Sequence, residues 1–365
     1  DTKEAWSSFD VSLICGIMIS ALFLFAAGFF PSWILGLYTK DLSIVNTGAV
    51  YFRIVAFSYI PMAVSNILSS WLRCKEHATI PFLASFGAVA VNTGLNYLLI
   101  FGKFGVPQLG IAGAAIGSSL AELVSLIFFI LYTRHRIDIR KYGLDKIPGI
   151  RWNILKRMLN VSFWTMVQNF LSLSTWFLLF LYVEHLGERS LAVTNIIRNV
   201  SGIMFMVMMA FASTCGSLVS NLIGAGHTDC VPGTIRQHIR IAYAFVLPLA
   251  VFFALCPKLI LSVYTDMPEL QEAAVPSLWV LCSAYLFLVP ANVYFQSVSG
   301  TGNTRTALAL EMITLVVYTC YITYIVAYLK LDVAFAWTSE IVYSVGILVL
   351  CYFYMKKGKW SLKKI

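Results

Sequence analysis

Charged residues are scarce in this sequence: they make up 12% of the 365 residues, whereas 59% are hydrophobic. Soluble domains carry roughly 25% charged residues, and a soluble fold of this length could not hide so much apolar surface. The shortage of charge therefore excludes a soluble protein and predicts a membrane protein. The net charge of +9 is then mainly a statement about topology, because membrane proteins concentrate Lys and Arg in their cytoplasmic loops.

The sequence also lacks the patterns of a disulfide framework, a metal site or an active site. Its eight cysteines are scattered without a CxxC pair, and none of its five histidines forms a metal-spaced pair. An intramembrane enzyme would need paired carboxylates, a His-rich cluster or a nucleophile beside a base, and none of these appears. We therefore predict no catalytic residue, no metal and no cofactor. The chain opens on Asp1 without a signal-peptide pattern, which suggests that its start is missing.

Long apolar runs are what the sequence has in abundance. A spanning helix needs about 20 mostly apolar residues, and by that measure ten runs qualify. Pro61, Pro248 and Pro290 fall inside them and are expected to be tolerated within helices, where prolines often mark kinks. The runs cover residues 10–37, 48–72, 79–102, 109–133, 158–183, 190–222, 239–264, 273–298, 306–329 and 333–355.

Basic residues gather between the fourth and fifth runs. Eight of them lie in Arg134–Arg157, which could be a nucleic-acid patch if it stood alone. With ten spans, however, 19 Lys and Arg residues lie on the side shared by this stretch and both termini, and only 5 on the other side. This imbalance predicts cytoplasmic termini and a cytoplasmic 134–157 loop, and it leaves no role for nucleic acid.

An internal repeat appears at a constant offset of 226 residues. Pro31–Thr39 (PSWILGLYT) aligns with Pro257–Thr265 (PKLILSVYT), and the same offset pairs Tyr59 with Tyr285 and Asn66 with Asn292. Runs one to four thus correspond to runs seven to ten, in the same orientation, as a parallel repeat. Runs five and six have no counterpart, so we expect that two helices precede Asp1 in the intact protein.

These observations predict an all-α polytopic membrane protein with two lobes built from parallel repeats. The expected organisation is a partial lobe of four helices at residues 1–133 and a cytoplasmic loop at 134–157. A lobe of six helices with a basic tail follows at 158–365.

Three loose sequence patterns, in a common order over essentially the whole chain, resemble the multidrug and toxic compound extrusion (MATE) family. The resemblance implies a twelve-helix, two-lobed antiporter, here lacking its first two helices, that exchanges organic compounds for H⁺ or Na⁺. The patterns are Asn221–Gly226 (NLIGAG), Ser299–Arg305 (SGTGNTR) with its echo Leu72–Pro81 (LRCKEHATIP), and Val91–Gly102 (VNTGLNYLLIFG) followed by Leu109–Ser118 (LGIAGAAIGS).

Polar side chains inside predicted spans are the first functional candidates, because they are costly in a bilayer. Asn92 and Asn96 are four residues apart and share one helix face, and they resemble the Asn and Asp of the family's cation site. Asn66 resembles another polar member of that site. Glu122, one turn after Ser118, should be protonated, paired (for example with Arg53) or water-facing, which suits a proton carrier. The alternative for the asparagines is structural hydrogen bonding between helices.

The second half offers amides and hydroxyls, which argue against a carboxylate mechanism there but could line a substrate cavity. Arg198 lies inside a span and needs a partner or an aqueous cavity. Glu311 and Glu340 are expected near helix ends, reaching an interface. The GxxxG match Gly113–Gly117 indicates close helix packing. The cavity candidates are Gln168, Asn169, Ser172, Arg198, Asn292 and Gln296.

The leading prediction is a secondary active antiporter that exports organic, often cationic, drugs or metabolites by alternating access. It would be a monomer in the plasma membrane whose partners are the small-molecule substrate and the lipid bilayer. One alternative is a lipid-linked oligosaccharide flippase of the same superfamily, although only Arg53 and Arg198 are intramembrane cations. Another is an inactive fragment.

Overall fold

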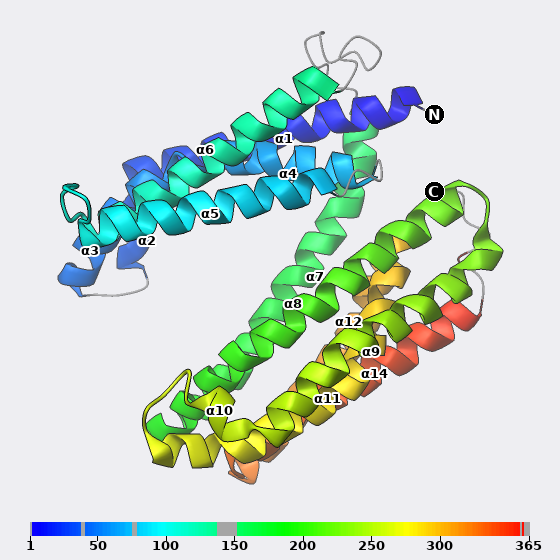
Figure 1. Ribbon diagram of the computed structural model, residues 1–365. Helices are drawn as coiled ribbons and strands as arrows, with labels where there is room; N and C mark the ends of the chain where they lie inside the picture. Colours follow the sequence, from blue (N-terminus) through cyan, green and yellow to red (C-terminus); the bar gives the residue numbers. More distant parts are fainter. Residues whose placement is uncertain (1, 38–40, 75–78, 137–151, 358–359, 361–365) are drawn as a thin grey trace. The chain divides into compact units, whose positions relative to one another are not determined.

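The computed structural model describes residues 2–37, 41–74, 79–136, 152–357 and 360. The chain divides into two compact units, Asp1–Met158 and Leu159–Ile365. Every regular element in these described stretches is helical, so the predicted all-α class is confirmed (Figure 1).

The first unit packs four long helical segments around a small core. Helices α5 and α6 lie side by side, and α1 packs against α4 (Figure 1). Phe9, Leu72 and Phe129 form the centre of its apolar cluster. The helices are α1 (Thr2–Phe29), α2 (Pro31–Gly36), α3 (Leu42–Ala56), α4 (Tyr59–Cys74), α5 (Thr79–Phe101) and α6 (Gly110–Arg136).

The second unit is built around one helix, α11 (Pro268–Gly300), which packs against α8, α9 and α14. Its core is larger than that of the first unit and includes Tyr285, Met204 and Met208, all fully buried. The other elements are α7 (Trp152–Glu184), α8 (Glu188–Gly224), a 3₁₀ turn (Thr228–Cys230), α9 (Val231–Leu255), α10 (Pro257–Leu261), α12 (Thr304–Ile322), a π-helical segment (Thr323–Tyr328), α13 (Val333–Trp337) and α14 (Ser339–Lys356).

The helices are long and apolar enough to cross a bilayer. Within the described residues nine segments meet this condition singly, and the bent pair α3–α4 can make a tenth span. The ten predicted runs coincide with these segments. The predicted loop at 134–157 is shorter in the structure, because α6 continues to Arg136 and α7 begins at Trp152. The middle of that loop, 137–151, lies outside the described residues.

The internal repeat is visible in the helix boundaries. Helix α1 ends at Phe29 and α9 ends at Leu255, 226 positions later, and each is followed by a short helix that begins with proline. Phe30 and Cys256, the residues before these prolines, have nearly the same backbone angles (φ −120°, ψ 36° and φ −119°, ψ 52°). Proline disfavours the α conformation in the preceding residue, so both predicted runs become a long helix and a short one.

The two repeats differ where α3 meets α4. Here the chain breaks between Ala56 and Tyr59 with a bend of 48°, whereas the corresponding stretch of α11 is continuous. Pro61 explains the break, since its ring would clash with the carbonyl of Phe57 in a continuous helix. The equivalent position of α11 is Phe287. Pro61 lies in the first turn of α4, and Pro248 and Pro290 lie inside α9 and α11, so the prediction that all three fall within helices is confirmed.

Replacing Tyr285 with Phe is expected to destabilise the protein by about 1–2 kcal/mol. Tyr285 is fully buried, and its hydroxyl donates to the Ser201 carbonyl at 3.0 Å and lies 3.1 Å from the Ser201 hydroxyl. The variant removes both of these contacts between α11 and α8 from the core. The measurement is the midpoint of thermal unfolding in detergent.

The internal repeat supplies the control for this substitution. Tyr59 is the counterpart of Tyr285, but it is half-buried and makes no side-chain hydrogen bond to the described residues. We expect Tyr59→Phe to leave the midpoint unchanged. Equal midpoints for the two variants would show that the Tyr285 hydroxyl contributes nothing.

Candidate functional site

Polar residues predicted for the first half of the chain form a group between α5 and α6. The Asn92 side-chain amide donates to the Ser118 hydroxyl at 3.2 Å, and the Asn96 amide donates to the Asn92 side-chain oxygen at 3.0 Å. The i, i+4 spacing places both asparagines on the face of α5 that meets α6. The structure thus brings together three of the five residues expected in this site.

One oxygen of this group has no donor. The side-chain oxygen of Asn96 is buried, and no hydrogen bond reaches it from the described residues. A buried acceptor without a partner is costly, so this oxygen can accept a proton donor or bind a cation. The small size of Gly117 makes room for it, because a Cβ atom there would overlap the Asn96 oxygen.

Glu122 lies one turn beyond Ser118 on the same helix. Its carboxyl is half-buried, and it forms neither a hydrogen bond nor an ion pair within the described parts of the chain. The predicted alternative of a pair with Arg53 is absent, and Arg53 is exposed. Next to this group, the Ser119 hydroxyl contacts the Ile54 carbonyl at 3.2 Å and ties α6 to α3.

Asn66 does not join this site. Its side chain is exposed on α4, and it has no hydrogen bond to Asn92, Asn96 or Ser118. The break before α4 changes the course of the chain at Phe57 and Ser58, before Asn66 is reached. Asn66 was suggested by the order of the sequence patterns along the chain, and that order carries no information about this bend.

Gly113 and Gly117 confirm the predicted close packing. A Cβ atom at Gly113 would lie 2.6 Å from the Leu99 carbonyl oxygen, so the two helix backbones touch. At Gly117 the obstacle is the mobile end of the Asn96 side chain. We expect Gly117→Ala to leave the protein folded but to turn Asn96 aside, which separates it from Asn92 and reduces transport strongly. Efflux by cells with equal protein levels measures this effect.

The matched control is Gly94→Ala on α5, where a Cβ atom would meet nothing within 4 Å. This variant should transport as the wild type does. If Gly117→Ala kept full transport, the Asn92–Asn96 contact would have no part in the site.

A second polar group, in the second unit, was missed by the sequence analysis. Glu311 is only 3% exposed and lies within α12. Its Oε1 atom accepts hydrogen bonds from the Ser172 hydroxyl and, at 3.4 Å, from the Tyr343 hydroxyl. The buried side chain of Gln168 faces the same carboxyl. The expectation that Glu311 lies near a helix end and reaches an interface is therefore wrong.

One feature of the α12 sequence could have indicated this polar group. Glu311, Thr314 and Tyr318 follow at helical spacing and are all buried, so α12 carries a polar stripe on its inner face. Glu340, by contrast, is near the start of α14 as expected. The contact with Ser172 could not be read from the sequence, since 139 residues separate the two partners.

The other candidates of the second half do not gather in one place. Asn169 is exposed, and the Arg198 guanidinium is also exposed and lies over the Phe180 ring at 5.4 Å. Asn292 bonds to the Leu288 carbonyl of its own helix at 3.0 Å. Gln296 is half-buried, and its backbone oxygen is approached by α8 at Gly216. Only Gln168 and Ser172 share a carboxyl partner.

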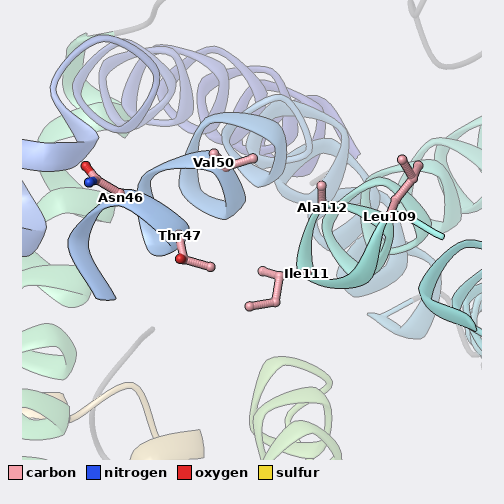
Figure 2. Close-up of a pocket in the computed structure, with 6 residues that line it drawn as sticks. All are labelled: Asn46, Thr47, Val50, Leu109, Ile111 and Ala112. Carbon is pink, nitrogen blue, oxygen red and sulfur yellow. The ribbon is translucent and has the colours of Figure 1, made fainter. Parts of the chain in front are cut away.

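A surface pocket in the first unit lies apart from the Asn92–Asn96–Ser118 group. It is formed where α3 and α6 begin, and the Thr47 and Ile111 side chains point toward its centre (Figure 2). The Thr47 hydroxyl is already bonded to the Ser43 carbonyl at 2.9 Å. No predicted site residue lines this pocket, whose lining residues are Asn46, Thr47, Val50, Leu109, Ile111 and Ala112.

Metal-binding chemistry is not indicated by either polar group. In the part of the chain that the structure describes, no three His, Cys, Asp or Glu side chains come together as metal ligands. Amides, hydroxyls and isolated carboxyls remain, and these can bind protons, monovalent cations or polar ligands.

The comparisons with known proteins agree with this architecture. Residues 1–98 and 165–325 match the MatE family model. The probable multidrug resistance protein NorM of Thermotoga maritima is 24% identical over 368 residues, which cover 99% of this chain and 77% of the relative. The uncharacterized transporter YisQ of Bacillus subtilis is 20% identical over 319 residues, which cover 86% of this chain and 68% of the relative.

Solved structures of transporters share the fold. A MOP superfamily transporter from Pyrococcus furiosus superimposes with a TM-score of 0.88 at 17% identity, over 100% of this chain and 81% of its own. An outward-facing multidrug resistance MATE family transporter gives a TM-score of 0.87 at 17% identity, over 99% of this chain and 84% of its own. At these identities the likeness establishes the fold.

Proposed function

Since the chain belongs to the MatE family, we propose that it is a secondary active antiporter that exports organic, often cationic, compounds in exchange for H⁺ or Na⁺. The lobes would alternate access to a substrate cavity between the two sides of the membrane. Two relatives are named probable multidrug resistance protein NorM, and this name supports export as the direction of transport.

The observation that carries the proposal is the Asn92–Asn96–Ser118 group with Glu122 one turn away. Polar and ionisable groups within spanning helices mark ion pathways, because burying them in a bilayer is costly. Here one amide oxygen is unpartnered and the Glu122 carboxyl has no ion pair. We assign ion coupling to this group, with Glu122 as the group that changes its charge.

The charge balance favours cationic substrates. Arg53 and Arg198 are the only basic residues that the sequence places deep within spans, so a polyanionic pyrophosphate would find few partners. This weighs against the flippase alternative. Aromatic rings are abundant, with 26 Phe, 18 Tyr and 9 Trp, and they can offer π-faces to organic cations. Gln168, Ser172 and Asn292 are proposed as polar contacts of the cavity.

The protein is proposed to act as a monomer in the plasma membrane with both termini in the cytoplasm. This orientation rests on the distribution of Lys and Arg, 19 on one side and 5 on the other. Figure 1 shows helices that run antiparallel to their sequence neighbours within each unit, as a multi-pass topology requires.

Efflux of ethidium from cells that express the chain tests the proposal. We expect ethidium efflux to be faster than from cells with an empty vector. When the driving gradient is collapsed, the efflux rate should fall to that of the empty vector. A proton ionophore and a sodium ionophore, applied separately, identify the ion. Efflux that persists at the full rate with both gradients collapsed would rule out ion exchange.

A further inference from the structure

Glu311 joins three helices of the second unit at a single oxygen atom. Its Oε1 accepts the hydroxyl of Ser172 from α7 and the hydroxyl of Tyr343 from α14, while Glu311 itself lies on α12. Gln168, one turn before Ser172, faces the same carboxyl and is also buried. This carboxyl is therefore the polar centre of the contact between α7 and the rest of the unit.

The second carboxyl oxygen of Glu311 has no partner. Oε2 is buried, and no hydrogen bond reaches it within the described residues. An ionised carboxylate in such surroundings is strongly unfavourable unless a cation or several donors compensate it. No ion pair involving Glu311 occurs in the described chain. A single proton on Oε2 removes the charge and leaves Oε1 as a carbonyl oxygen that accepts both hydroxyls.

The groups that face this carboxyl favour a proton over a metal ion. From α14 they are Tyr343 and the thiol of Cys351, and Tyr343 in turn lies close to Glu340. From α12 the ring of Tyr318 stands against that of Tyr343, at 6.0 Å between centroids. None of these groups is basic. A Na⁺ or Ca²⁺ ion needs several oxygen ligands, whereas no hydrogen bond from the described residues reaches Oε2.

We propose that Glu311 is a proton-binding site that controls the attachment of α7 to α12 and α14. With the proton bound, the neutral carboxyl holds α7 through Ser172. When the O–H bond breaks, the proton passes to a water molecule that enters the contact. The remaining carboxylate is then hydrated, and this hydration weakens the contact of α7 with α12 and α14. The role of this proton site in transport rests on the proposed exchange function. The protonation of Glu311 and the attachment of α7 are independent of that function.

The remaining contacts of α7 are compatible with such a change. Much of its surface is exposed, and its polar contacts elsewhere are near its two ends: Asn160 accepts from Arg305 at 3.0 Å, and the hydroxyls of Tyr182 and Thr323 lie 3.1 Å apart. Leu179 is fully buried against the second unit. A thiol at this position reports whether the half of α7 that follows Ser172 is attached.

The test uses thiol labelling of the purified full chain at a series of pH values. Leu179→Cys places a thiol at the buried contact, and α7 contains no native cysteine, so peptide-resolved mass spectrometry reads this position alone. The same substitution is made together with Glu311→Gln, which keeps the shape of the carboxyl but cannot lose a proton. The ratio of the two labelling rates at each pH cancels the ionisation of the thiol itself.

We expect the ratio to be near one at acidic pH and to rise by about tenfold or more at alkaline pH, because an uncompensated buried charge is strongly destabilising. The infrared absorption of protonated carboxyls should be weaker in Glu311→Gln than in the wild type. A ratio that stays at one over the whole pH range would overturn the proposal, as would identical carboxyl bands in both proteins.

A second pair of variants covers the case in which Glu311→Gln does not fold. Ser172→Ala removes the hydroxyl that Glu311 accepts and should raise labelling of the introduced thiol even at acidic pH. Ser174→Ala changes an exposed hydroxyl on the same helix and should not. Equal labelling in these two variants contradicts the proposal. None of these readouts involves transport, so failure of the exchange function would leave them unchanged.

Discussion

Glu122→Gln is expected to reduce coupled efflux to the level of an empty vector while the protein is still made and inserted. Glu122 is the ionisable side chain next to the Asn92–Asn96–Ser118 group, and no described residue compensates its charge. Glutamine keeps the size and the hydrogen-bonding capacity of the side chain but cannot exchange a proton. The measurement is ethidium efflux at equal protein level, established by immunoblot of the membrane fraction.

Glu184→Gln is the control for this substitution. Glu184 is the last residue of α7, and its side chain is exposed and forms no ion pair with the described residues. Its replacement should leave efflux intact. If Glu122→Gln transported as fast as the wild type, Glu122 would have no part in coupling, and the site of ion exchange would have to lie elsewhere.

Gly300→Ala is expected to have the largest effect on stability. A Cβ atom at Gly300 would overlap the Gly216 carbonyl oxygen and lie 3.0 Å from its carbonyl carbon. Both obstacles are backbone atoms of α8, which cannot turn aside as a side chain can. Overpacking of this kind lowers the free energy of unfolding by about 1–3 kcal/mol. The loss should be near the upper limit of this range, because α8 and α11 must move apart to make room for the added methyl group. Thermal unfolding of the purified protein in detergent measures the loss.

Gly224→Ala provides the comparison, because a Cβ atom at this α8 position would meet nothing within 4 Å. Its unfolding midpoint should equal or exceed that of the wild type, since alanine favours helices over glycine. Equal midpoints for Gly300→Ala and Gly224→Ala would mean that α8 and α11 do not approach as closely as the structure shows.

The fold follows from the sequence to a large extent, for physical reasons. Apolar runs of spanning length must form helices in a bilayer, because every backbone group needs a partner within its own segment. The repeat then predicts equivalent boundaries, and Pro31 and Pro257 indeed start equivalent short helices. The prolines were expected to mark kinks, but the sequence does not say which of them bends its span, because a proline can be accommodated inside a helix, as Pro248 and Pro290 are, or can break it.

The candidate sites show where sequence reasoning stops. Asn92 and Asn96 could be paired by their spacing within one helix, and the match to Ser118 follows from the contact of two consecutive helices. Glu311 and Ser172 are 139 residues apart, and no local pattern relates them. Asn66 was proposed from its likeness to a family position, and in the structure its side chain is exposed and makes no hydrogen bond to Asn92.

The two units therefore hold their ionisable groups in different ways. In the first unit, Glu122 is half-buried and has no partner in the described chain. In the second, Glu311 is buried and accepts two hydroxyl groups. Glu122→Gln should therefore affect transport without a large effect on stability, whereas substitutions at Glu311 should alter the attachment of α7 as well.

Ion exchange by the purified chain in proteoliposomes tests the central claim most directly. A proton or sodium gradient is imposed across the vesicle membrane, and the movement of ethidium is followed by fluorescence. The account predicts uphill movement of ethidium against at least one of these ions, which stops when that gradient is dissipated and is absent with Glu122→Gln. Ethidium movement that is the same with and without both gradients would contradict it.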